Sequence, residues 1–355
     1  MSADTRQLIL MDDRNLILHS HISKLEYWKW WFLVALNITF LTIGQSSAII
    51  LGRVYYDHGG NSTWMATLVQ TAAFPILIPC LFISSSRDSP ISQMVLIYFA
   101  LGLLLAVDNM LYSIGLLYLS ASTYSLICAI QLAFNAVFSF LINGQKFTML
   151  IFNSVIVLTL SAALLALNDG SGEERVSRLK YVIGFISTIG ASALYSLLLS
   201  LLQLVFQKFL KEEETFSVVL YMQIYTCFVA TSVSVMGLFG SGEWNLVKDE
   251  MNSFSLGKTS YVLNLVGTAV SWQVSSVGVV GLVFAVSSLF SNVISTLSLA
   301  ITPIVAVVVL RDMMNGVKVI SLLMALWGFA TYIYQNYLDD CEERLNRDKA
   351  HPHIV

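Results

Sequence analysis

Charge is scarce in this chain. Of its 355 residues only 12% are charged, whereas 56% are hydrophobic. Soluble domains carry about 25% charged residues, so this composition excludes an ordinary water-soluble globular protein. The net charge is −3 and the sequence has no basic cluster. The net charge says little about partners. The missing basic cluster argues against nucleic acid, since binding to phosphate backbones needs a positive surface.

Histidine and cysteine are also few, and their positions do not suit metal chemistry. The five histidines fall in tails or loops, at 19, 21, 58, 351 and 353. The four cysteines, at 80, 128, 227 and 341, have neither metal-ligand spacing nor a pairing pattern. We interpret the cysteines as small buried apolar residues. No cluster of catalytic polar residues stands out, so we expect a protein that is not an enzyme and holds no metal or other cofactor.

What the chain has in abundance is apolar sequence of membrane-spanning length. A helix needs about 20 mostly apolar residues to cross the hydrocarbon. Ten such stretches are predicted, at 29–53, 62–83, 92–112, 117–142, 148–167, 181–206, 215–239, 259–280, 283–310 and 317–338. Tyr27 and three tryptophans crowd the start of the first stretch, as in an interfacial aromatic belt. The expected fold class is an all-α integral membrane protein with ten transmembrane helices in a lipid bilayer.

A polar break divides the ten stretches into five and five. Because five is odd, two halves of the same fold would be inverted in the membrane, with a midplane site between them. The expected parts are an N-terminal tail 1–28, a first five-helix repeat 29–167, a connecting loop 168–180, a second repeat 181–338 and a C-terminal tail 339–355. The balance of Lys and Arg between the two sides is too slight to set the orientation.

Asp108 is the one carboxylate well embedded in an apolar stretch. A charge in the hydrocarbon is costly, so an embedded ionisable residue is a functional hypothesis by default. Two interpretations stay open: a protonatable group that couples proton movement to solute movement, or an acid near a helix end that is hydrated or caps the following turn. No Lys or Arg lies at mid-depth in any stretch. Anionic solutes need a close cation, so a neutral or weakly basic solute is favoured.

Uncharged polar side chains share helix faces inside the apolar stretches. In the fourth stretch Tyr124, Cys128, Gln131 and Asn135 recur at helical spacing. Carboxamides match the donor–acceptor edge of adenine, and aromatic rings can stack on the base. The alternative is that such amides only join helices to each other. The predicted substrate-binding residues are Trp64, Gln70, Tyr124, Gln131, Asn135, Gln223, Trp272, Gln273 and Asn292.

Several strings resemble the plant purine permease family within the drug/metabolite transporter superfamily. They include TLVQT at 67–71, STYSLIC at 122–128, QLAFN at 131–135, MQIY at 222–225 and SSLFSNVIST at 287–296. The resemblance extends from about residue 30 to residue 340. Ser120 and Ala300 depart from it, since the family often has proline there, and Asn315 replaces a frequent aspartate. These departures put the substrate range in question more than the fold.

The resemblance implies two inverted five-helix halves, cytosolic termini and a location in the plasma membrane. It also implies proton-coupled import of adenine-type purine bases and derivatives such as cytokinins, with Asp108 as our candidate for the proton carrier. The alternative on the same fold is an exporter, or a transporter of the vacuolar membrane, for alkaloid-like or other neutral metabolites. The sequence sets neither the preferred purine nor the oligomeric state.

Overall fold

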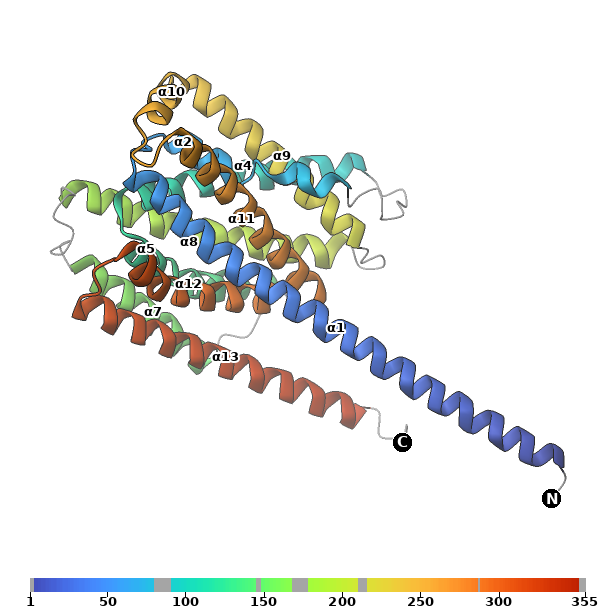
Figure 1. Ribbon diagram of the computed structural model, residues 1–355. Coiled ribbons are helices and arrows are strands. Elements are labelled where there is room, and N and C mark those ends of the chain that lie inside the picture. Colours follow the sequence, from blue (N-terminus) through green and yellow to red (C-terminus); the bar gives the residue numbers. More distant parts are fainter. Residues whose placement is uncertain are drawn as a thin grey trace.

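The chain folds into a bundle of helices in the computed structural model, which describes residues 3–79, 91–144, 148–167, 178–209, 216–286 and 288–350. Every regular element in these ranges is helical (Figure 1). The elements are α1 Ala3–Asp57, α2 Thr63–Val69, the 3₁₀ helix η1 Phe74–Leu77, α4 Ile91–Tyr118, α5 Ala121–Cys128, α6 Gln131–Asn143, α7 Met149–Leu167, α8 Arg178–Phe209, α9 Phe216–Gly240, α10 Trp244–Ser253, α11 Lys258–Ala285, α12 Ser288–Leu310 and α13 Gly316–Ala350.

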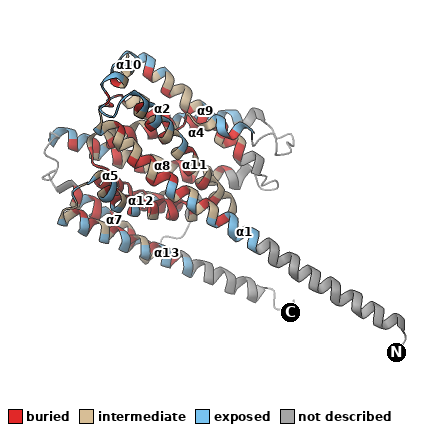
Figure 2. Cartoon of the chain, in the orientation of Figure 1, coloured by how far each residue is buried: buried red, intermediate tan, exposed pale blue. Residues whose placement is uncertain are grey.

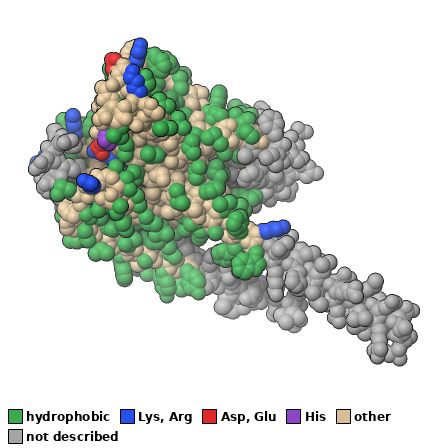
Figure 3. All heavy atoms as spheres, viewed as in Figure 1, with side chains coloured by type: hydrophobic (Ala, Val, Ile, Leu, Met, Phe, Trp, Pro, Cys, Tyr) green, Lys and Arg blue, Asp and Glu red, His purple; other side chains and the backbone are tan. Residues whose placement is uncertain are grey.

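The apolar surface confirms an integral membrane protein. Among the described residues, 8 helices are long and apolar enough to cross a membrane, and the segments Thr63–Leu77 and Met149–Leu165 are shorter apolar helices. Large apolar side chains point outward: Leu96 is 74% exposed and Val308 is 76% exposed. Figure 3 shows such side chains spread over the visible face. A continuous apolar exterior is stable only where lipid is the solvent.

The expected helix boundaries need several corrections. The second stretch is not one helix, because α2 ends at Val69 and a 3₁₀ turn containing Pro75 follows; a proline removes a backbone donor. The fourth stretch is also broken, into α5 and α6. The helix α4 extends past the expected end at 112 to Tyr118. Ser113 fits within this helix, where it donates its hydroxyl to the Asn109 carbonyl at 2.9 Å.

Both expected tails join helices without a break. The helix α1 begins at Ala3, within the expected tail 1–28, and α13 continues beyond 339 to Ala350. Trp28 and Trp31 are 72% and 47% exposed on α1, as an aromatic belt requires. The two helices leave the bundle on the same side, so both termini lie there, away from α10 (Figure 1).

The helices pack closely through small residues. A methyl group placed on Gly44 of α1 would lie 2.6 Å from the backbone nitrogen of Ser275 on α11, so only glycine permits this approach. Gly278 of α11 faces the α1 backbone in the same way. Small residues are common where membrane helices meet. Buried residues gather along the middle of the bundle (Figure 2), where α1, α4, α5, α8 and α12 share one core cluster.

The short helix α10 was not predicted, and it ties the start of α2 to the bundle. Glu250 of α10 is 5% exposed and accepts hydrogen bonds from Tyr55 at 2.8 Å and Tyr261 at 3.3 Å. It also accepts from the backbone nitrogens of Asn61 at 3.0 Å and Ser62 at 2.8 Å. A carboxylate at the first turn of a helix satisfies amides that have no partner within the helix.

Candidate substrate-binding site

A cavity of about 130 Å³ lies in the middle of the bundle, where helices from both parts of the chain meet. Six carboxamide side chains line it: Gln45, Gln70, Asn109, Gln131, Gln223 and Gln273. Four aromatic rings also line it: Tyr112, Tyr124, Tyr195 and Trp272. Asp108 is its one acid, and neither Lys, Arg nor His is among its lining residues. The cavity is therefore built for an uncharged or weakly basic molecule that can stack and form hydrogen bonds.

Two of the glutamines stand where a helix is interrupted. Gln70 is the C-cap of α2, just before the 3₁₀ turn. Gln131 begins α6, after a junction in which Ile130 and Ala133 form hydrogen bonds to residues three positions earlier rather than four. Discontinuous helices at membrane depth occur where they line a cavity or are buried in protein. The broken second and fourth stretches therefore meet at the site.

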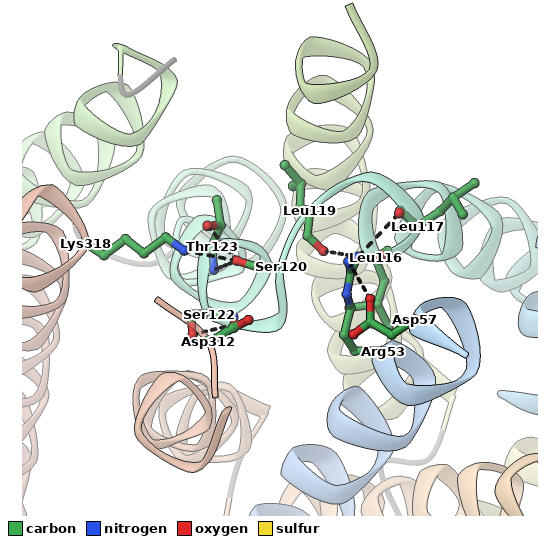
Figure 4. Close-up of polar contacts among 10 residues, drawn as sticks. All are labelled: Arg53, Asp57, Leu116, Leu117, Leu119, Ser120, Ser122, Thr123, Asp312 and Lys318. Atoms are coloured by element: carbon green, nitrogen blue, oxygen red, sulfur yellow. Dashed lines mark hydrogen bonds and ion pairs between the residues drawn. The ribbon is translucent and has the colours of Figure 1, made fainter. Parts of the chain in front are cut away.

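The turn between α4 and α5 places Tyr112 and Tyr124 against each other in the cavity wall, with ring centroids 5.9 Å apart. Figure 4 shows how this turn is held. Arg53 donates to the carbonyls of Leu116 at 2.9 Å, Leu117 at 3.3 Å and Leu119 at 2.7 Å, and so satisfies the last carbonyls of α4. Its other nitrogen pairs with Asp57 at 2.8 Å.

The start of α5 is held from the other side by the linker after α12 and by the first turn of α13. Asp312 accepts hydrogen bonds from the backbone nitrogen of Ser122 at 3.0 Å and from its hydroxyl at 2.8 Å. Lys318 donates to the Ser120 hydroxyl at 3.1 Å (Figure 4). Charged groups at this end of the molecule are thus used to fix helix ends, which positions the uncharged cavity wall.

The carboxamides differ in how they are engaged. Gln70 donates through Nε2 to the Asn109 carbonyl at 3.1 Å and to the Ser113 hydroxyl at 2.9 Å, so it also joins helices. Gln223 donates through Nε2 to the Ser276 hydroxyl. By contrast, Nε2 of Gln273 is buried and has no hydrogen-bond partner in the described part of the chain. Gln70 and Gln223 therefore fit the interpretation that amides join helices, whereas Gln273 is available to bind a solute.

Asp108 lies deeper than the sequence indicated. Because α4 continues to Tyr118, the carboxyl group is in the helix interior and not near its end. The residue is 1% exposed, and its Oδ1 has no hydrogen-bond partner among the described residues. At this position the carboxyl group does not cap the end of α4. Thr226 Oγ1 is a second buried oxygen of the cavity lining without a partner there.

Seven of the ten predicted site residues line the cavity: Gln70, Asp108, Tyr124, Gln131, Gln223, Trp272 and Gln273. The other three lie elsewhere. The Trp64 ring packs on Gly237 at the start of α2. Asn135 lies one turn further along α6 and interacts with Tyr332 of α13. Asn292 is fully buried in α12, outside the cavity lining.

Among the carboxamides and aromatic rings of the lining, four were missed: Gln45, Asn109, Tyr112 and Tyr195. Gln45 and Asn109 are carboxamides inside apolar stretches, which is the criterion that selected the other amides. Applied to the first and third stretches, that criterion would have found both. Cys128 and Cys227 are buried free thiols, which confirms the interpretation of these two cysteines as small buried residues.

Comparisons with known proteins identify the family. A family model for purine nucleobase transmembrane transport matches residues 32–342. The chain belongs to the plant purine permease family. One relative of this purine permease family member is probable purine permease 11 of Arabidopsis thaliana, which is 60% identical over 98% of this chain and 94% of its own. Two further relatives come from the same plant. Probable purine permease 13 is 50% identical over 98% of this chain and 99% of its own length, and purine permease 21 is 52% identical over 90% of this chain and 84% of its own length.

One solved protein structure overlays on this purine permease family member with a TM-score of 0.50 and 14% identity, covering 85% of this chain and 98% of that one. The likeness concerns the fold alone. The departures from the family pattern are also accommodated by the fold. Ser120 has φ −64°, which proline could share, and its hydroxyl caps α5. Asn315 Oδ1 accepts from the Lys318 backbone nitrogen at 2.9 Å, as an aspartate could. Ala300 is buried in α12.

Proposed function

We propose that this protein is a secondary transporter that imports adenine-type purine bases, and derivatives such as cytokinins, with protons across the plasma membrane. The observation that carries the proposal is the chemistry of the cavity: six carboxamides and four rings around a void without a cation. The family and the names of its plant relatives support purine as the solute class.

The size of the cavity supports a solute that is built on a compact, flat ring system. An apolar cavity of roughly 150 Å³ takes up benzene in another protein, so a void of about 130 Å³ suits a compact ring system. Trp272 and Tyr124 supply ring faces for stacking. The unpartnered Nε2 of Gln273 supplies a donor that costs free energy while it is buried and unpaired. A ring nitrogen of the solute would remove that cost.

Asp108 supports coupling to protons. It is buried beside the solute cavity, with no cationic side chain in the lining to balance a negative charge. An unpaired buried charge costs several kcal/mol, by order of magnitude. Proton uptake removes the charge, so the two protonation states of Asp108 favour different surroundings. In our proposal Asp108 takes up a proton from the outside and releases it to the cytosol, together with the base.

The packing of the helices supports ten passes in two inverted halves, 29–167 and 181–338. The 8 long helices and the two shorter apolar segments would supply the passes. Helix pairs recur reciprocally between the halves. The first helix of the first half, α1, packs on α11 and α12 of the second half, and the first helix of the second half, α8, packs on the corresponding helices α4 and α6 of the first half. The last helices of the halves, α7 and α13, pack on each other. Reciprocal pairing is what a two-fold axis between inverted repeats would produce.

Uptake of labelled adenine tests the proposal. Cells that lack their own nucleobase uptake should accumulate adenine when they express the chain, and a protonophore should abolish the accumulation. Unlabelled adenine and zeatin-type bases should compete, whereas charged nucleotides should not. Counterflow in vesicles of known orientation separates import from export, and microscopy of a tagged chain separates plasma membrane from vacuole. The proposal is refuted if neither cells nor vesicles of either orientation show saturable adenine uptake.

A further inference from the structure

A single hydroxyl on α12 joins two carboxamides of the cavity wall. Ser295 Oγ lies 3.3 Å from Nε2 of Gln131 and 3.1 Å from Oε1 of Gln45. Gln131 begins α6 and Gln45 lies on α1, and both line the cavity. All three side chains are buried. Because both carboxamides contact the same oxygen atom, they lie close together on one wall.

Thr296 determines which end of the Gln131 carboxamide faces α12. The Thr296 hydroxyl donates its hydrogen to the backbone carbonyl of Asn292 at 2.9 Å. A hydroxyl has one hydrogen to donate, so toward any other group Thr296 can only accept. The Gln131 atom that lies 3.4 Å from Thr296 Oγ1 must therefore be the donor Nε2. Gln131 Oε1 is left without a hydrogen-bond partner among the residues that the structure describes.

The Gln45 carboxamide is oriented in turn by Ser295. Ser295 accepts from Gln131 Nε2, and its own hydrogen goes to Gln45 Oε1. Gln45 Nε2 then has no partner in the described ranges. The wall offers the cavity one acceptor, Gln131 Oε1, and one donor, Gln45 Nε2, in an order that the α12 hydroxyls impose.

We infer that Gln131 and Gln45 form a subsite that selects bases by the order of hydrogen-bonding groups along one ring edge, with Ser295 and Thr296 as its positioning residues. This inference rests on the proposed function, since it takes a purine-type base as the occupant. A ring with an amino group beside an unprotonated nitrogen offers a donor and then an acceptor, which complements the pair. A ring with a carbonyl beside N–H offers the reverse order. In the same orientation, such a base places its N–H against Gln45 Nε2 and its carbonyl against Gln131 Oε1, so that donor faces donor and acceptor faces acceptor. Turning the base over would correct this pairing but would move its second ring to the opposite side.

Competition against labelled adenine uptake measures the selection. The ratio compared is the half-inhibitory concentration of hypoxanthine, a 6-oxopurine, divided by that of adenine, a 6-aminopurine. In Ser295→Ala the Gln45 carboxamide loses the hydroxyl that orients it and can rotate, while Thr296 still contacts Gln131. We therefore expect this ratio to fall about tenfold, the order expected when one good base contact loses its discrimination. Thr296→Val keeps the side-chain shape but removes the group that sets the Gln131 polarity, and the ratio should fall here as well.

Ser298→Ala is the matched control. Ser298 lies one turn further along α12 and is equally buried, and its hydroxyl also contacts α1, at Ser46 (3.2 Å) and the Thr42 carbonyl (3.2 Å). It does not line the cavity. Ser298→Ala thus removes a serine hydroxyl from the same helix without touching the subsite. The ratio of the half-inhibitory concentrations of hypoxanthine and adenine should stay at the wild-type value.

The outcomes separate this subsite from the function beneath it. If Ser295→Ala and Thr296→Val transport adenine with the wild-type ratio, the subsite is refuted while the proposed function stands. If Ser295→Ala does not reach the membrane, Thr296→Val decides in the same way, and binding to the purified variant in detergent replaces uptake. If the unaltered chain neither transports nor binds adenine, the proposed function fails, and the subsite fails with it.

Discussion

A conservative change at Asp108 separates charge from shape. Asparagine is uncharged but has nearly the same volume as aspartate, so Asp108→Asn should relieve the cost of burying an unpaired charge. We expect the variant to be at least as stable as the wild type in detergent. We also expect adenine uptake into proteoliposomes to lose its response to an inward proton gradient while counterflow exchange persists. The control is Asp57→Asn, since Asp57 is exposed and pairs with Arg53 outside the cavity. An unchanged gradient response in Asp108→Asn would remove Asp108 from the coupling step.

Two cavity glutamines should respond in opposite ways to replacement by leucine. Gln273 Nε2 is buried without a partner among the described residues, so Gln273→Leu removes an unsatisfied donor and should leave the melting temperature unchanged or higher. Gln70 holds α2 against α4, so Gln70→Leu should destabilise by about 1–3 kcal/mol. Both variants should bind adenine more weakly. Thermal unfolding with and without adenine measures both effects. Equal stability losses in the two variants would contradict this division of roles.

At the scale of helices, the buried carboxylate of α10 holds three elements at one end of the bundle. Glu250→Ala leaves the hydroxyls of Tyr55 and Tyr261 and two backbone amides without their acceptor. Hydrogen bonds to a charged group contribute about 1.5–3 kcal/mol each, so we expect a clear drop in melting temperature. Asp249→Ala is the control on the same helix, because Asp249 is exposed. Equal melting temperatures for the two variants would contradict the role of Glu250.

The contact between α1 and α11 gives a second prediction at this scale. Gly44→Ala would force the two backbones apart, since its methyl group would lie 2.6 Å from the Ser275 nitrogen. We expect a large loss of stability and of transport. Gly190→Ala is the control in α8, where the added methyl would make an ordinary contact of 3.5 Å with Leu111. It should be neutral or stabilising, because alanine favours helix by about 1 kcal/mol over glycine. The same loss in both variants would contradict the α1–α11 packing.

Hydrophobic runs were sufficient to predict the long helices, because lipid makes them long and apolar. They could not predict the break between α5 and α6, since neither proline nor glycine lies at 129–130. The depth of Asp108 was misjudged because the third stretch was expected to end at 112, whereas α4 continues to Tyr118. The helix α10 was missed because it is too short and polar for a span.

At the scale of the whole molecule, the position of the termini limits how often the chain crosses the membrane. Both termini lie on the side of the bundle away from α10 (Figure 1). Termini on one side require an even number of crossings, and ten satisfies this, whereas eight long helices would satisfy it equally. If the 8 long helices all cross, the short segments Thr63–Leu77 and Met149–Leu165 must either both cross or both not cross. Because α10 and the two termini lie at opposite ends of the bundle, the side of the membrane on which α10 lies gives the orientation of the whole protein.

Labelling from outside the cell determines this orientation. Leu246 of α10 is 51% exposed, so Leu246→Cys, made in a chain whose own cysteines are replaced, should react with a membrane-impermeant maleimide in intact cells. Epitope tags at the two ends should bind antibody only after permeabilisation, because the tails would be cytosolic. Accessible tags on intact cells, together with an unreactive Leu246→Cys, would mean that α10 faces the cytosol. An imported base would then enter at the end of the bundle where the two termini lie. One tag exposed and the other hidden would mean an odd number of crossings, which two inverted five-helix halves cannot produce.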